Sequence, residues 1–472
     1  MATQTQQTAL RTPRRGDHGA ANLFMVIFAL AVVANFGVMI WFWLRDGGVT
    51  GQVIGVAGAL TTAGRITGLI GAYFALLQVL LLARLPPLER RIGMDRLAVW
   101  HRINGKLVIY LVVAHVILIT IGYAGLGHTG WISQFGSFLS SYKGMVTATI
   151  GTVLMIVTVI TSLVIARRRL SYEAWYAVHL TVYGGIFLAY LHQLPTGWDF
   201  KANNTWHNMP LAAKLQSDWW VALYVATLAL LIVYRVLIPL VRFYREGLRV
   251  ESVERVSADV VTITVAGKRL DRVHAAGGQF LLWRFMSKGL WWQSHPFSLS
   301  AAPDGRTLRI TVKAVGDYTR SLLQVPVGTR VFAEGPFGRF VATRRQRPHV
   351  TMIAGGIGVT PLRAILEELD DCDVTFIYRG VSDADLVLRD EIEQLTASRG
   401  AQLHELVGDH ADPRYADLLG PENLRALAPH IANSDVFLCG PLPMMHHTID
   451  SLRQLGVPKH QIHWESFAFA VS

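Results

Sequence analysis

The fold is decided by two apolar stretches, WHRINGKLVIYLVVAHVILITIGYA at residues 100–124 and YEAWYAVHLTVYGGIFLAYLH at residues 172–192. Each is long enough, at about 20 residues, to cross the hydrocarbon core of a bilayer as a helix. Each also carries two histidines, which are rare in such segments because an ionisable group is costly in hydrocarbon. The sequence therefore predicts two membrane-embedded helices whose histidines serve a function.

The histidines recur at nearly equal spacing in the two stretches. His101 and His115 are 115 − 101 = 14 residues apart, and His179 and His192 are 192 − 179 = 13 residues apart. At about 1.5 Å rise per residue, both pairs span about 20 Å of helix. Neutral imidazoles are good axial ligands for haem iron, and two of them make an electron-carrying b-type haem. We expect two stacked haems, an inner one held by His101 and His179 and an outer one held by His115 and His192.

The spacing of 13 residues between His179 and His192 requires a local change in the direction of the helix. Thirteen residues leave a helical phase error of roughly 140°. Gly184 and Gly185 lie between His179 and His192, where a kink or a π-bulge could redirect the helix. Two other interpretations are lone histidines bonded to backbone carbonyls and a proton relay in a transporter. The first does not account for four matched histidines, and the second does not predict the soluble half that follows.

Four more apolar runs of similar length accompany these two stretches. Basic residues precede the first run, as in a secretory signal, but the run is longer than a signal core, so we expect a retained helix. The predicted fold class is multidomain and begins with an α-helical transmembrane bundle of six spans. The predicted spans are Leu23–Leu44, Gly64–Leu85, Trp100–Ala124, Gly144–Ala166, Tyr172–His192 and Trp219–Leu240.

Lys and Arg gather on one side of this arrangement, and cytoplasmic loops are enriched in these residues. We therefore place the N-terminus and everything after Leu240 in the cytoplasm, in a multi-pass protein of the plasma membrane. The flanks placed inside contain Arg11, Arg14, Arg15, Arg84, Arg90, Arg91, Arg96, Arg167, Arg168 and Arg169, and those outside contain Arg45, Arg65, Lys143, Lys201 and Lys214.

The composition agrees with a membrane half and a soluble half. Hydrophobic residues make up 51% of the chain and charged residues 16%, below the roughly 25% usual in soluble proteins. The net charge of +11 sits largely beside apolar runs, which indicates contact with the lipid bilayer and argues against nucleic acid as a partner. The two cysteines, Cys372 and Cys439, are too few for an iron–sulfur cluster or a structural zinc site.

After about Arg249 the pattern changes to short alternating strands, which predicts an antiparallel β-barrel. A flat aromatic cofactor needs a backbone edge and a hydroxyl at its ring, and cations or amides at its pyrophosphate. Ser298 suits the ring, and Lys313 with the following turn suits the pyrophosphate. The candidate residues are His295, Pro296, Phe297, Ser298, Lys313, Gly316, Asp317, Tyr318 and Thr319.

A strand, a glycine turn and a helix follow the barrel, and this combination forms an anion site at the helix N-terminus. A second strand and helix continue an α/β pattern. Arg379, at the end of that second strand, either meets a ribose 2′-phosphate or is a surface arginine. The candidate residues are Gly355, Gly356, Gly358, Thr360, Pro361, Arg379 and, after the last predicted strand (Val436–Leu438), Cys439, Gly440 and Pro441.

Together these residues resemble the ferric reductase and NADPH oxidase superfamily, from the second span to nearly the end of the chain. The resemblance rests on the histidine spacings, HPFS at 295–298, GDYT at 316–319, AGGIGVTP at 354–361 and CGP at 439–441. It implies FAD on the barrel, a nicotinamide near Cys439 and a C-terminal aromatic stacked on the isoalloxazine. Phe467 matches that aromatic, although five residues follow it. Phe467 and Cys439 are thus the candidate catalytic residues.

The resemblance implies a transmembrane oxidoreductase. Electrons would pass from cytoplasmic NADPH, rather than NADH, through FAD and two b-type haems to dioxygen or a ferric chelate outside. The alternatives are a module that feeds electrons to a partner protein, and a membrane-anchored flavin reductase without haem. The predicted domains are a cytoplasmic segment (1–22), a transmembrane bis-haem domain (23–243), a FAD-binding β-barrel (247–345) and an α/β nucleotide-binding domain (347–472).

Overall fold

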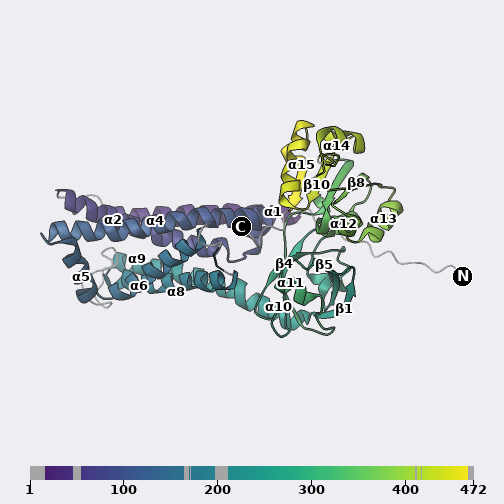
Figure 1. The fold of residues 1–472 in the computed structure, drawn as a ribbon. Coiled ribbons are helices and arrows are strands. Elements are labelled where there is room, and N and C mark those ends of the chain that lie inside the picture. Colours follow the sequence, from purple (N-terminus) through teal and green to yellow (C-terminus); the bar gives the residue numbers. More distant parts are fainter. Residues whose placement is uncertain are drawn as a thin grey trace. The chain divides into compact units, whose positions relative to one another are not determined.

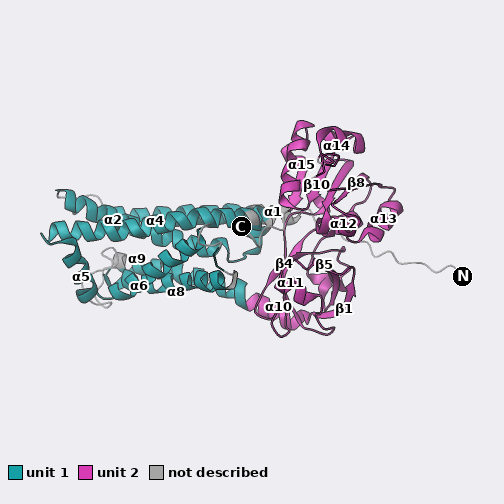
Figure 2. Ribbon diagram, viewed as in Figure 1, with its two compact units in different colours: residues 1–236 teal, residues 237–472 magenta. Residues whose placement is uncertain are grey.

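The computed structural model of the 472-residue chain describes residues 16–45, 55–163, 169–170, 172–196, 211–409, 412–415 and 417–465. The chain forms two compact units, residues 1–236 and residues 237–472 (Figure 2). Each unit has hydrophobic cores of its own.

Unit 1 is built from long apolar helices. Among the described residues, six helices are long and apolar enough to cross a membrane, which confirms the six predicted spans. Those spans are Met25–Arg45, Gly55–Leu81, Arg96–Leu126, Met145–Ser162, Ala174–Thr196 and Lys214–Glu246. The helices that carry them in unit 1 are α1 (Gly16–Arg45), α2 (Gly55–Leu81), α4 (Met94–Leu126), α6 (Met145–Ser162), α8 (Tyr172–Thr196) and α9 (Leu211–Ile232).

Small residues let these helices approach closely, as is common between membrane helices. α2 runs along α4, and α6 runs along α8 (Figure 1). A Cβ atom on Gly122 of α4 would lie 2.4 Å from Thr61 Oγ1 of α2, and one on Gly151 of α6 would lie 2.5 Å from the Gly185 carbonyl oxygen of α8. A larger residue at either glycine would push the paired helices apart.

Unit 1 also departs from the sequence prediction in three places. The short helices α3 (Pro86–Ile92) and α5 (Trp131–Ser141) were not expected. α8 is α-helical from Tyr172 to Thr196, so the suggested π-bulge at Gly184 and Gly185 is absent from this described helix. Arg65, which was assigned to an outer flank, lies inside α2, because that helix begins at Gly55.

Unit 2 opens with α10 (Ile238–Glu246), which follows a π-helical turn at Val233–Leu237. The β-subdomain comes next and has two three-stranded antiparallel sheets, ordered β1-β2-β5 and β4-β3-β6. Isolated bridges at Arg249–Arg330 and Leu299–Ile310 join the edges of these two sheets, so the expected barrel is built from two separate sheets linked by single bridges. The strands are β1 (Arg249–Arg255), β2 (Val260–Ala266), β3 (Phe280–Phe285), β4 (His295–Ser298), β5 (Thr307–Lys313) and β6 (Val331–Phe337).

The nucleotide subdomain has a parallel sheet in the order β11-β10-β7-β8-β9. Chain order reverses between β7 and β10, and ligands of such sheets bind outside the carboxyl ends of the strands at that switch point. β9 and β11 were not predicted, so the strand expected to be last is followed by another. The elements are β7 (His349–Gly355), β8 (Asp373–Gly380), β9 (Gln402–Val407), β10 (Asp435–Cys439) and β11 (Ile462–Glu465), with helices α12 (Val359–Glu368), α13 (Arg389–Ser398), α14 (Pro421–Leu427) and α15 (Leu442–Gln454).

Candidate functional site

Four histidines of unit 1 form two pairs between α4 and α8. The ring centres of His101 and His179 are 6.2 Å apart, and those of His115 and His192 are 6.4 Å apart. The structure therefore brings together the two pairs that the sequence spacing suggested, about 20 Å apart along the helices. The spacing of 13 residues between His179 and His192 is therefore accommodated without a π-helical turn in α8.

Each of the four rings has a hydrogen-bond partner at Nδ1. A carbonyl oxygen can only accept, so Nδ1 carries the proton wherever its partner is a carbonyl, and Nε2 keeps its lone pair. Within the described part of the chain, no hydrogen bond engages any of the four Nε2 atoms. The Nδ1 partners are the Gln78 carbonyl for His101 (3.2 Å), the Gly64 carbonyl for His115 (2.7 Å), the Ser162 hydroxyl for His179 (3.3 Å) and the Ala189 carbonyl for His192.

Gly68 on α2 gives the His115 ring its space. A Cβ atom at this position would lie 2.4 Å from His115 Nδ1, closer than any real contact. The glycine therefore leaves room for the imidazole beside α2 and lets it reach the Gly64 carbonyl.

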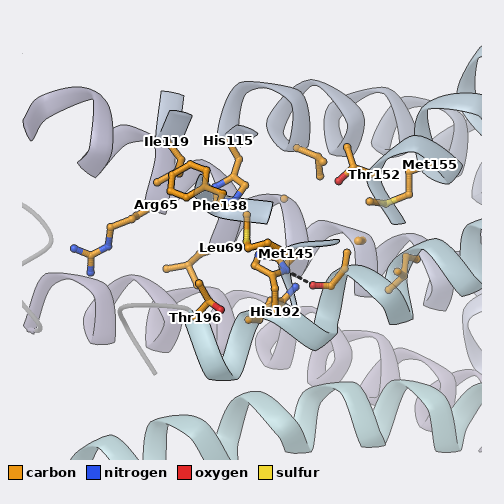
Figure 3. A pocket seen from close by; sticks show the side chains of 18 of the residues that line it. Arg65, Leu69, His115, Ile119, Phe138, Met145, Thr152, Met155, His192 and Thr196 are labelled. Carbon is orange, nitrogen blue, oxygen red and sulfur yellow. Dashed lines mark hydrogen bonds between the residues drawn. The ribbon is translucent and has the colours of Figure 1, made fainter. Parts of the chain in front are cut away.

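A cavity lies beside the outer pair, and His115 and His192 both line it (Figure 3). Its walls are mostly apolar and include Phe138 of α5. Arg65, only 7% exposed, also lines it, and an arginine inside an apolar span is a sequence signal that could have found it.

Gln193 contributes a polar group to the same cavity. Its Oε1 atom accepts hydrogen bonds from Trp220 Nε1 at 2.8 Å and from the Tyr224 hydroxyl at 3.2 Å. Sequence reasoning missed all three residues, because Trp220 and Tyr224 come from α9 and meet Gln193 only in the folded bundle.

In unit 2, the two proposed flavin motifs are in contact. β4 is the HPFS segment itself. The ring centres of His295 and Tyr318 are 3.9 Å apart, so β4 lies against the GDYT segment. Trp283 Nε1 donates to the Phe297 carbonyl oxygen at 3.1 Å, which ties β4 to the core of its sheet. Ser298 is buried, while His295, Pro296 and Phe297 are half-buried.

The GDYT segment is the start of a short helix, α11 (Asp317–Leu322), rather than a free turn. The Thr319 hydroxyl accepts the backbone N–H groups of Val315 and Gly316, both at 2.9 Å, so it shapes the bend before the helix. The Asp317 side chain is fully exposed.

Lys313 ends β5 and pairs with the nucleotide subdomain. Its Nζ atom is 3.1 Å from Asp385 Oδ1 and 3.7 Å from Asp259 Oδ2. Burial alone would raise the pKa of Asp385, but hydrogen bonds from Lys313 and Ser382 outweigh it and lower that pKa. Lys313 therefore bridges the two subdomains, and its contact with a pyrophosphate stays a prediction.

The glycine loop and the CGP segment pack backbone against backbone at the switch point of the sheet. Gly356 has a φ of +52°, which favours glycine. A Cβ atom on Gly358 would lie 2.4 Å from the Cys439 carbonyl oxygen, and one on Gly440 would lie 3.1 Å from Gly355 Cα. Glycines at these positions therefore let the ends of β7 and β10 meet.

Three predicted residues of this region are internal. The Thr360 hydroxyl, on a residue 3% exposed, donates to the Ile357 carbonyl oxygen at 3.1 Å, and Pro361 is also buried. Cys439 is fully buried, and burial together with the nearby Glu465 carboxylate raises the pKa of its thiol well above the usual value. The thiol is therefore neutral at physiological pH.

Arg379, at the end of β8, is folded against the backbone. Its guanidinium donates to the carbonyl oxygens of Gly380, Leu406 and Gly408. Burial lowers the pKa of this guanidinium. Since both terminal nitrogens of the guanidinium donate within the sheet edge, this placement does not favour contact with a 2′-phosphate. Phe467 lies outside the described residues.

Part of the chain is similar to two curated bacterial proteins. The chain is 35% identical over 182 residues to a flavohemoprotein of Vibrio cholerae, covering 36% of this chain and 45% of that protein. It is 31% identical over 206 residues to the ferredoxin reductase component of 3-ketosteroid-9-alpha-monooxygenase from Mycobacterium tuberculosis, covering 42% and 56%. The chain thus spans about half the length of the curated relatives it matches.

A solved structure is also similar. It is the flavohem-like FAD/NAD-binding domain of the nitric oxide dioxygenase from Vibrio cholerae, 28% identical, with a TM-score of 0.38. The similarity covers 47% of this chain and 99% of that domain.

Three families match successive parts of the sequence. Residues 67–190 match the ferric reductase like transmembrane component, residues 245–341 an FAD-binding domain and residues 352–450 an oxidoreductase NAD-binding domain. The chain therefore joins a ferric reductase like transmembrane component to an FAD-binding domain and an NAD-binding domain. This succession of domains is the ferric reductase and NADPH oxidase architecture, and the chain belongs to that superfamily.

Proposed function

We propose that the protein transfers electrons from a cytoplasmic nicotinamide nucleotide across the plasma membrane to an acceptor on the other side. The path consists of FAD in unit 2 and two b-type haems in unit 1. The observation that carries this proposal is the pairing of four imidazoles whose Nε2 atoms have no hydrogen-bond partner in the described bundle.

The distances between the rings fit two bis-histidine haem sites. A metal–imidazole bond of about 2 Å on each side, plus about 1 Å from each nitrogen to its ring centre, requires about 6 Å between ring centres. The observed separations are 6.2 and 6.4 Å. In the described parts of the chain no group of three or more His, Cys, Asp or Glu side chains could hold a metal ion, so paired ligands are the available donor set.

The chain's own residues would prepare each ligand for iron. Nδ1 contacts such as that of His115 with the Gly64 carbonyl hold the ring in one orientation and keep the proton away from Nε2. Gly68 leaves room for that orientation.

When bound, FAD accepts a hydride from the nicotinamide and releases electrons one at a time, and b-type haems carry them singly. The β-subdomain would hold FAD with HPFS and GDYT, which His295 and Tyr318 bring into contact. The bare glycine loop before α12 would receive the nucleotide's pyrophosphate.

The proposal of NADPH rather than NADH rests on Arg379 alone. Its guanidinium would have to exchange backbone carbonyls of β8 and β9 for a phosphate. An Arg379→Ala assay, described in the Discussion, decides this point.

The acceptor we propose is dioxygen, giving superoxide, or a ferric chelate. Dioxygen would be reduced outer-sphere in a small polar pocket, whereas a ferric chelate would need an open, positively charged mouth. The cavity lined by both His115 and His192 is where the outer haem itself would lie. Measuring superoxide formation and ferric-chelate reduction side by side, with the same purified protein and NADPH, would separate the two acceptors.

Two spectroscopic and kinetic outcomes would contradict the proposal. A reduced-minus-oxidised spectrum without haem bands would leave a membrane-anchored flavin reductase. Oxidation of the reduced protein only after addition of a second membrane or periplasmic protein would instead identify a module that feeds electrons to a partner.

A further inference from the structure

The loop between β3 and β4 exposes two adjacent indole rings. Trp291 is 57% exposed and Trp292 is 45% exposed. The loop is an ordered turn, because the Ser287 carbonyl oxygen accepts the backbone N–H groups of Leu290 and Trp291. Leu290 is 5% exposed and belongs to the core of the β-subdomain. Its burial fixes the two tryptophans that follow it in an outward position.

This loop begins next to α10. The backbone N–H of Met286, the first loop residue, donates to the Arg330 carbonyl oxygen at 2.8 Å. The Arg330 guanidinium lies 4.3 Å from the ring centre of Phe243 on α10, and that ring packs against Phe332 of β6 at 5.5 Å. Because α10 is the end of the sixth candidate span, Lys214–Glu246, the loop starts next to the end of that span.

The surroundings of the loop have the composition of a membrane interface. Met286 and Tyr244 are exposed at 42% and 67%. Lys288 in the loop and Arg245 and Arg249 around the end of α10 are exposed cations. Tryptophan and tyrosine concentrate at the headgroup level of bilayers, and basic residues there attract anionic lipids.

We propose that Trp291 and Trp292 insert into the headgroup layer of a bilayer that contains anionic lipid, with Lys288, Arg245 and Arg249 facing the lipid phosphates. This contact anchors the β-subdomain at the membrane surface independently of the covalent link through α10. An ordered loop with two neighbouring indoles in water is otherwise hard to explain, since exposed apolar patches mark interaction sites.

The test uses the full-length protein in nanodiscs with a bimane probe on a single cysteine. Cys372→Ser removes the half-exposed thiol, and Cys439 is buried. The probe is placed by Trp292→Cys or, as a matched control, by Val256→Cys. Val256 is exposed and follows the far end of β1, about 20 Å from Arg249 beside α10.

The nanodiscs contain a lipid with a nitroxide on its headgroup as the quencher. We expect the probe at 292 to be quenched several-fold more strongly than the probe at 256. Replacing anionic by zwitterionic lipid, or adding Lys288→Glu, should weaken this quenching.

Two outcomes would overturn the proposal. Equal nitroxide quenching at 292 and 256, with both probes open to aqueous iodide, would show that the loop stays in water. A probe at 292 that is shielded from iodide but not quenched by the nitroxide lipid would show that the loop is covered by protein.

Discussion

The Nδ1 contacts of the four histidines determine at the residue scale what each imidazole can bind. Three of the partners are backbone carbonyls, which do not change with side-chain substitution, so the tautomer is set by the helix backbones themselves. The sequence spacing predicted which histidines pair but could not predict these contacts. They depend on how α2 lies against α4, and Gly64 and Gly68 contribute through their backbone and through the space they leave.

Gly68→Ala should displace the His115 ring, because the new methyl group would lie 2.4 Å from Nδ1. We expect the variant to bind about one haem per chain instead of two, with the haem at His101 and His179 retained. Pyridine haemochrome analysis of the purified protein measures the ratio. Gly37→Ala is the control, since a Cβ atom there has no neighbour within 4 Å. Two haems in Gly68→Ala would mean that the ring does not need this space.

Arg379→Ala should remove three hydrogen bonds to backbone carbonyls at the sheet edge. At about 1–3 kcal/mol for hydrogen bonds to a charged group, the main effect should be on the stability of the nucleotide subdomain. The geometry predicts that KM for NADPH and KM for NADH change to the same extent. A rise in KM for NADPH alone would show that the guanidinium turns to a 2′-phosphate and would support NADPH as the donor.

At the scale of helices and strands, the most regular patterns were the most predictable. Apolar runs of about 20 residues gave six spans, and the strand–glycine–helix order gave β7 and α12. α5 was missed, because Trp131–Ser141 contains serines and a glycine and packs only through residues such as Phe138. β11 was missed, because its four residues gain their strand structure by pairing with β10.

The contact between the two subdomains of unit 2 also could not be read from the sequence. Arg363 of α12, 7% exposed, lies between them and donates to the Ser300 carbonyl oxygen and to Glu391 of α13. The Glu391 carboxylate also accepts a hydrogen bond from a second arginine, Arg309 of β5. Burial alone would raise the pKa of Glu391, but the hydrogen bonds and charges of these arginines lower it below its usual value.

Glu391→Gln should therefore destabilise unit 2 in a pH-dependent way. Because the pKa is lowered by folding, the stabilisation is present above the ordinary value of 4.5 and is lost as pH falls through the lower folded value. With the side chain a third exposed, the loss at neutral pH should be about 1 kcal/mol. Thermal release of FAD, followed by its fluorescence from pH 7 downward, measures the difference.

Glu393→Gln is the matched control for that experiment, since Glu393 lies on the same helix and pairs with Arg389 at the surface. It should behave like the unmodified protein at every pH. A difference between Glu391→Gln and the unmodified protein that persists unchanged into acid would contradict the electrostatic explanation.

For the whole molecule, the sequence separates a membrane half from a soluble half, and the structure separates at Val236 and Leu237 into the same two halves. This agreement arises because a span needs an apolar surface and a flavin module needs a polar one, so the two compositions cannot mix. Neither the electron acceptor nor the position of Phe467 could be predicted from the composition. Residues 197–210 and 466–472, which include Phe467, lie outside the described ranges.

The central claim is that the two histidine pairs hold two haems in series. The most direct test is the haem content of the full-length protein and of His115→Ala, together with NADPH-driven reduction of an acceptor enclosed on the far side of proteoliposomes. We predict two haems per intact chain and one in His115→Ala. In the variant, NADPH should still reduce FAD, but no electrons should reach the enclosed acceptor. One haem in the intact chain, or undiminished transfer in His115→Ala, would contradict the account.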